Sequence, residues 1–254
     1  MSHDSQSNIP PCVTSFDSRY YIGGAIGQGS TGTVFEAVSQ IDKRTFAIKR
    51  FFRAADPERI DSEIRAASLD STFQSCSHVL RTIEFLLDPG DRNFRPGKAV
   101  VYEYCEGSLA SLLEGRQAKD RQSRSLDIND WKWVTVARHL LCGIAALQSR
   151  GLADIHIRPQ SILICQSSPD KFELKLADYW KSPPSGSPSL LVRAAAILNS
   201  ALDTLGSRGA EASGAASFVK QLTDEKRSFS ASVALQALNS LYSPSMLCRC
   251  SVMF

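Results

Sequence analysis

The sequence lacks any long apolar run. No stretch approaches the roughly 18 consecutive apolar residues that a membrane-spanning helix needs, and no apolar segment of the secretory kind opens the chain. Charge of one sign is also scarce, because 29 basic and 26 acidic residues leave a formal net charge of only +3. The basic residues are scattered, so we expect neither nucleic acid nor a membrane as a partner.

Cysteines are few, odd in number and widely spaced. The seven are Cys12, Cys76, Cys105, Cys142, Cys165, Cys248 and Cys250. This pattern, without a secretory segment, argues against a secreted disulfide scaffold. We therefore predict reduced thiols in an intracellular protein of the cytoplasm or nucleus.

The sequence of the first half of the chain predicts several strands and one helix. Apolar and β-branched runs over 19–38, 44–52, 78–88 and 98–106 predict strands, the first range holding two of them. Residues 56–70 begin with Asp-Pro and carry apolar residues at helical spacing, which predicts a helix. The expected order is three strands, a helix and two strands.

The second half is mainly helical. Helices are predicted over 127–151, 190–205 and 213–240, with a hairpin around 167–178 and a Pro/Ser/Gly-rich loop at 181–189. At 254 residues and 43% hydrophobic, the chain can bury a large core. A strand-rich half followed by a helical half predicts an α+β protein of two lobes with a cleft between them.

The segment "IGQGSTGTV" places Gly27, Gly29 and Gly32 at G-x-G-x-x-G spacing, with Val34 two residues on. Glycine allows a backbone to approach phosphate closely. A dinucleotide-binding loop of this spacing leads into a helix, and a plain hairpin turn is also compatible with it. Here a β-like segment follows, then Lys49 in "FAIK", and alternating βα units are absent, which disfavours a dinucleotide-binding enzyme.

This order of motifs resembles the eukaryotic protein kinase family, in which a strand lysine pairs with a helix glutamate. Glu63 in "SEIRAA" takes the glutamate's place, and "VVYEYCEGSLASLL" resembles the segment that joins the lobes and contacts adenine. The resemblance implies ATP as ligand, with these nucleotide-contacting residues: Ile26, Gly27, Gln28, Gly29, Ser30, Gly32, Val34, Ala47, Lys49, Glu63, Glu103, Cys105 and Leu163.

The catalytic motifs are altered. "LKLADYW" resembles the family's DFG motif, with Asp178 as the metal-binding acid, and "RPQSILI" resembles "KPENILI". Arg158 then replaces the phosphate-contacting lysine, and Ser161 replaces the asparagine that holds a second metal. His156 falls at the catalytic aspartate and Asp154 at the family's histidine, so the order of these two is reversed.

These changes predict a pseudokinase that binds ATP but transfers phosphate poorly or not at all, with weak or absent Mg²⁺ binding. Loss of a positioned base alone costs about 10²–10⁴ in rate. The activation segment is shortened to the loop at 181–189, without an A-P-E motif, and Ile155 stands where the family has an activating arginine. The alternative is an active kinase that uses His156 or Asp154 as the catalytic base. Within the protein kinase family, the motifs of this chain most resemble those of the Wee family.

The expected organisation is a lead-in at 1–17, a kinase-like N-lobe at 18–104, a truncated kinase-like C-lobe at 105–240 and a tail at 241–254. Function would then rest on regulation or scaffolding of a protein partner such as another kinase. An apolar stripe at Leu191, Ala194, Ala195 and Leu198 has two interpretations, a core helix or a docking surface for that partner.

Overall fold

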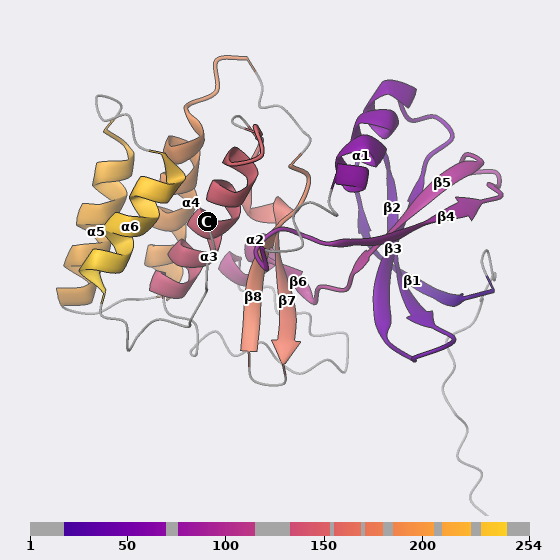
Figure 1. The fold of residues 1–254 in the computed structure, drawn as a ribbon, viewed down its shortest axis with the longest axis horizontal. Coiled ribbons are helices and arrows are strands. Elements are labelled where there is room, and N and C mark those ends of the chain that lie inside the picture. The colour runs from indigo at the N-terminus through magenta and orange to yellow at the C-terminus, as the bar shows by residue number, and fades with distance from the viewer. Residues whose placement is uncertain are drawn as a thin grey trace, which may run out of the picture. The chain divides into compact units, whose positions relative to one another are not determined.

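The computed structural model describes residues 18–69, 76–114, 133–152, 155–168, 171–179, 185–205, 210–224 and 230–242. The chain divides into two compact units. Unit 1 comprises residues 1–69 and 81–104, and unit 2 comprises residues 70–80 and 105–254. Unit 1 is β-rich and unit 2 is mainly helical (Figure 1), which confirms the expected α+β, two-lobed fold class.

Unit 1 is built on a five-stranded antiparallel sheet in the order β1-β2-β3-β5-β4 (Figure 1). Its elements are β1 (Tyr20–Gln28), β2 (Gly32–Ser39), β3 (Thr45–Phe51), α1 (Pro57–Leu69), β4 (Thr82–Asp88) and β5 (Gly97–Glu103). The predicted order of three strands, a helix and two strands is confirmed.

One face of this sheet buries an apolar cluster, and the other buries apolar residues together with Lys49. Successive side chains of a strand point to opposite faces, so Phe46 and Ile48 of β3 join one apolar core cluster with Ala99 and Val101 of β5. Lys49 belongs to the other set of β3 positions. The ion pair that it makes with α1 shows that this second face is the one turned toward the helix.

Helix α1 begins where the sequence predicts it. The Asp56 carboxylate accepts the backbone N–H of Glu58 at 3.0 Å, which satisfies one of the donors that a helix start leaves unpaired. Ile60 and Ala67, two turns apart, are each 2% exposed, and Glu63 between them is fully buried. The helix therefore carries a charged residue on its buried face, which requires a partner.

Unit 2 contains five α-helices and a three-stranded sheet among its described residues, with strand order β6-β7-β8. The elements are α2 (Leu109–Leu113), α3 (Trp133–Gln148), α4 (Leu190–Leu205), α5 (Ala210–Leu222), α6 (Ala231–Leu241), β6 (Gly107–Ser108), β7 (Ile162–Ser168) and β8 (Lys171–Leu176), with a 3₁₀ turn at Pro159–Ser161. Helices α3 to α6 pack side by side (Figure 1). Helix α3 is apolar on most of its circumference, and its Trp133 indole N–H donates to the Leu198 carbonyl of α4 at 2.8 Å.

Residues 76–80 belong to unit 2 because they pair with β8. The Leu80 N–H donates to the Leu176 carbonyl, and the Leu176 N–H donates to the His78 carbonyl, each at 2.9 Å. The His78 ring lies 4.2 Å from that of His139, centroid to centroid, and both rings contact the backbone of Leu174. This buried pair of imidazoles ties α3, β8 and the 76–80 segment together.

Two expectations for the helices change. The segment predicted as one helical stretch over 213–240 forms α5 and α6, two separate helices. The apolar stripe of α4 is core, because Leu191 is 8% exposed and Ala194, Ala195 and Leu198 are fully buried. Its interpretation as a docking surface is therefore wrong.

Candidate functional site

The glycine-rich loop joins β1 to β2 and has glycines of two kinds. A Cβ on Gly32 would lie 2.1 Å from the carbonyl oxygen of Arg50, so this glycine is required by the close approach of β2 to β3. At Gly27 and Gly29 a Cβ would meet no atom within 4 Å. Packing among the described residues therefore does not require glycine at these two positions, and their contact with a nucleotide stays a prediction.

Lys49 of β3 and Glu63 of α1 form a buried ion pair. Lys49 Nζ lies 2.5 Å from Glu63 Oε1, and the two side chains are 7% and 0% exposed. Val34 lies directly across from Lys49 on β2, and Ala47 precedes it by two residues on the same strand face. The structure thus brings together the lysine and glutamate that the sequence predicted as partners.

Thr31 completes this pair and was missed by the sequence analysis. Its hydroxyl lies 3.0 Å from Glu63 Oε2, the second oxygen of the carboxylate that holds Lys49. Thr31 is only 3% exposed, and its carbonyl accepts the N–H of Phe52 at 2.9 Å. The glycine-rich loop is therefore fastened to α1 through a charge-assisted hydrogen bond. No local sequence pattern indicates that a threonine in this loop forms a hydrogen bond with a glutamate 32 residues further along the chain.

The predicted catalytic loop of unit 2 is held by hydrogen bonds of the Ser161 side chain and backbone. The Ser161 hydroxyl donates to the Arg158 carbonyl at 3.0 Å and accepts the Arg158 N–H at 3.2 Å. The Ala177 N–H donates to the Ser161 carbonyl at 2.8 Å, which places Asp178 directly beyond this loop. The Ser161 side chain therefore caps the turn, and its prediction as a metal ligand stays a prediction.

Asp178 has an unusual backbone. Its φ of 57° lies in the left-handed region, which residues other than glycine rarely adopt and which is concentrated at functional sites. Its carboxylate is partly exposed and lies 3.7 Å from the Arg158 guanidinium. The predicted metal-binding acid and the predicted phosphate-contacting residue are thus neighbours.

His156 is half-buried between Ile155 and Ile157, which are 2% and 5% exposed. Arg193 of α4 holds residues 155–157 in place, because its Nη2 donates to the Ile155 carbonyl at 2.8 Å. Arg193 is accordingly part of the packing around the loop. Asp154, which the reversed order of residues pairs with His156, lies outside the described residues.

The segment predicted to contact adenine contains a disulfide. Cys105 is bonded to Cys165 of β7, with their Cα atoms 4.2 Å apart. The prediction of reduced thiols is therefore wrong for this pair, because the fold brings together cysteines 60 positions apart. Cys76 and Cys142 belong to no disulfide among the described residues.

Two other residues of the predicted adenine site lie on strands. The Glu103 N–H donates to the Arg81 carbonyl at 3.1 Å, and the Glu103 carboxylate accepts the Arg81 N–H at 2.7 Å. Leu163 pairs with Ser108 in the β6–β7 ladder and is half-buried. Each residue is held by its own unit. Trp180, part of the altered DFG motif, lies outside the described residues.

Neither a cluster of metal ligands nor a helix able to span a membrane is present in the part of the chain that the structure describes. No group of three or more His, Cys, Asp or Glu side chains is arranged to hold a metal ion there. Asp178 is a single carboxylate, which is the kind of ligand that Mg²⁺ takes when most of its other ligands are water or phosphate oxygens. No described helix is both long enough and apolar enough to cross a membrane.

Comparison with known families settles the class of protein. Residues 20–183 match the protein kinase domain family, which is more than half of the chain. The chain belongs to the protein kinase family. The matched range includes the glycine-rich loop, the Lys49–Glu63 pair, the 156–161 loop and Asp178.

Curated relatives of this kinase domain are distant. Mitogen-activated protein kinase kinase mkk1 of Cytospora mali is 26% identical over 175 residues, which is 68% of this chain and 30% of the relative. A mitogen-activated protein kinase kinase of Pyricularia oryzae is 27% identical over 176 residues, 68% of this chain and 31% of its own length. The serine/threonine-protein kinase ATG1c of Arabidopsis thaliana is 23% identical over 164 residues, 63% and 20% respectively. The chain thus spans about a third or less of these relatives.

Proposed function

We propose that this kinase domain binds ATP but transfers its phosphate poorly or not at all, and that it acts as a regulatory or scaffolding module. This proposal is supported by a contrast between the residues of unit 1 and those of unit 2. The Lys49–Glu63 pair expected of an ATP-binding kinase is formed in unit 1. The loop of unit 2 carries His156 and Ser161 where the family has an aspartate and an asparagine.

The residues of unit 1 fit the nucleotide. Glu63 holds the Lys49 ammonium at one place, where it can pair with phosphate oxygens as the family's lysine does. The open glycines of the loop allow its backbone N–H groups to approach the same phosphates. Asp178 would hold Mg²⁺, which when bound neutralises the charge of the phosphates.

The residues of unit 2 fit phosphoryl transfer less well. An imidazole at His156 can accept a proton, but it brings no negative charge to orient a hydroxyl next to a metal ion. Ser161 offers a short hydroxyl that already caps Arg158, in place of a carboxamide that could ligate a second metal. The Arg158 guanidinium, 3.7 Å from Asp178, further competes with a metal ion for the Asp178 carboxylate. These features support weak metal binding and slow transfer.

A thermal-shift titration with ATP, with and without Mg²⁺, tests nucleotide binding. A ligand at ten times its Kd stabilises the native state by about 1.4 kcal/mol, which raises the Tm of a protein of this size by about 3–6 °C. Lys49→Ala should abolish the shift. Lys98→Ala removes the same charge from an exposed position of β5 and should retain it. Absence of a shift in the wild type at millimolar ATP would contradict ATP binding and leave scaffolding as the proposed role.

The alternative function is an active, Wee-like protein kinase with a non-standard catalytic loop. It is supported by the assembled Lys49–Glu63 pair, which active kinases need, and by relatives that are named as protein kinases. Incubation with labelled ATP, Mg²⁺ and a generic protein substrate separates the two proposals. Transfer at about 1 s⁻¹ or faster, the range typical of kinases, would support the alternative, in which the chain phosphorylates protein substrates.

A further inference from the structure

The loop between β4 and β5 folds back onto the end of β3. The Arg53 N–H donates to the Asn93 carbonyl at 2.9 Å, and the Arg95 N–H donates to the Phe51 carbonyl at 3.0 Å. The rings of Phe52 and Phe94 stack at 5.8 Å between centroids. Two segments of unit 1 that are about 40 residues apart in sequence therefore form one wall.

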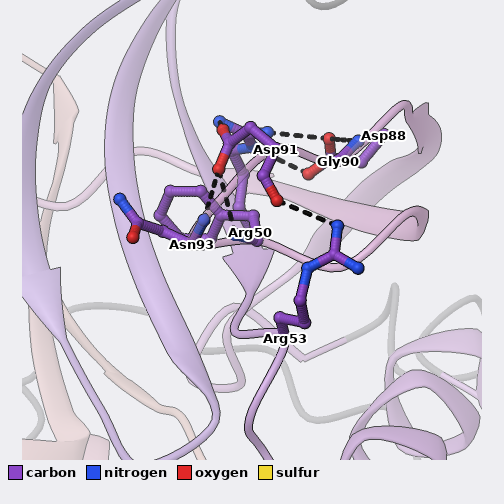
Figure 2. Close-up of polar contacts among 7 residues, drawn as sticks. Arg50, Arg53, Asp88, Gly90, Asp91 and Asn93 are labelled. Atoms are coloured by element: carbon purple, nitrogen blue, oxygen red, sulfur yellow. Dashed lines mark hydrogen bonds and ion pairs between the residues drawn. The ribbon is translucent and has the colours of Figure 1, made fainter.

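Arg50 and two aspartates fix the shape of this wall (Figure 2). Arg50 donates to both oxygens of Asp88, at 2.7 and 2.8 Å, and lies 3.0 Å from Asp91. Burial opposes the charge of Arg50, but the hydrogen bonds and charges of Asp88 and Asp91 together raise the pKa of the guanidinium. Burial likewise opposes the charge of Asp91, but the N–H groups of Asn93 and Phe94 and the nearby Arg50 together lower its pKa. The charge of Arg50 is thus balanced within the wall, and Arg50 stabilises the wall instead of contacting a ligand.

A pocket of about 520 Å³ opens beside this wall and is lined in part by Phe52, Arg53, Ala54, Arg92 and Asn93. One Nη of Arg53 donates to the Asp91 carbonyl at 2.9 Å, which limits where this guanidinium can lie (Figure 2). A guanidinium has five N–H donors, so most of those on Arg53 remain available. Among the described residues, neither Arg53 nor Arg92 is paired with a carboxylate.

The local charge favours a dianion. Residues 50–55 and 88–96 together contain four arginines and two aspartates, a net charge of +2. A phosphate monoester carries a charge of about −1.5 to −2 near pH 7 and accepts several hydrogen bonds. Paired guanidinium groups are the usual means by which proteins recognise it. A single carboxylate would balance only half of this charge.

We propose that this pocket binds a phosphorylated serine or threonine side chain of a partner polypeptide. Arg53 and Arg92 would hold the phosphate, and Phe52 and Ala54 would pack against an apolar residue next to it. The volume exceeds what a phosphate ion alone fills, and the apolar lining favours a peptide over a free ion. The pocket uses neither Lys49 nor Glu63, but its lining includes Ser30 of the glycine-rich loop, so we expect a bound nucleotide to influence the binding of the peptide.

Fluorescence anisotropy with a labelled peptide, Ala-Leu-phosphoserine-Leu-Ala, and its unphosphorylated twin tests the proposal on the full chain. We expect the phosphopeptide to bind at least about tenfold more tightly, a difference of about 1.4 kcal/mol. The double variant Arg53→Gln/Arg92→Gln should lose this preference. Arg59→Gln/Arg95→Gln removes the same charge from unit 1 at residues that do not line the pocket, and it should keep the preference.

Three outcomes would overturn the proposal. Equal binding of the two peptides would show that the pocket does not read phosphate. An equal loss in both double variants would show attraction by overall charge alone. Loss of phosphopeptide binding in Lys49→Ala would place the peptide at the nucleotide residues instead. Circular dichroism of each variant shows whether it is folded, and addition of inorganic phosphate distinguishes a peptide site from one that holds the ion equally well.

Discussion

The hydrogen bond from Thr31 to Glu63 can be removed with little change of shape. Thr31→Val replaces the hydroxyl by a methyl group of similar size in a position that is 3% exposed. Glu63 is fully buried, so the carboxylate oxygen that loses its donor cannot turn to water instead. A hydrogen bond to a charged group contributes about 1.5–3 kcal/mol. We expect the free energy of unfolding to fall by about this amount, and the Tm by about 3–12 °C.

Chemical and thermal denaturation of three variants measures this effect. Thr33→Val is the matched control, because Thr33 is a buried threonine of the neighbouring strand β2 that makes no side-chain hydrogen bond within the described residues. Thr31→Ser retains the hydroxyl and should recover most of the stability. If Thr31→Val and Thr33→Val lower the stability equally, the hydrogen bond from Thr31 to Glu63 contributes nothing to the stability of the native state.

The same variant also tests whether Thr31 positions the ATP-binding pair. Glu63 orients Lys49, so loss of the Thr31 bond should weaken the stabilisation by ATP in Thr31→Val, whereas Thr31→Ser should respond as the wild type does. A double-mutant cycle with Glu63→Gln should be non-additive, because the two residues share one bond. Additive effects would show that the two residues act independently.

Two further predictions concern the altered loop and the disulfide. The double variant Asp154→His/His156→Asp restores the family's order and should raise phosphate transfer from labelled ATP by up to about 10²-fold. This increase should exceed that of either single variant. A wild type as active as the double variant would support the active-kinase alternative. Reduction should lower the Tm of the wild type, because the Cys105–Cys165 bond closes a loop of 60 residues and such loops contribute up to about 4 kcal/mol. Cys165→Ser should not respond to reductant, and an equally unresponsive wild type, or one whose two thiols are free by mass spectrometry, would refute the bond.

The sequence alone was sufficient for features encoded within one element or turn. Apolar and β-branched runs predicted the strands of unit 1 and their order along the chain, and the Asp-Pro start predicted α1. The spacing of Gly27, Gly29 and Gly32 and the distance to Lys49 predicted the ATP-binding motifs, and Glu63 was found by its place in a family pattern. These signals are local, or are fixed in chain order, so a linear reading can recover them.

Only the tertiary structure decided the contacts between segments far apart in the chain. Thr31 meets Glu63 because β2 and β3 carry the loop to α1, and Cys105 meets Cys165 because β6 pairs with β7. The apolar stripe of α4 was compatible with core or with a docking surface, and packing against its neighbours buried it. An apolar stripe shows that one face of a helix must be buried. It does not show which segment buries that face, because this depends on the path of the whole chain.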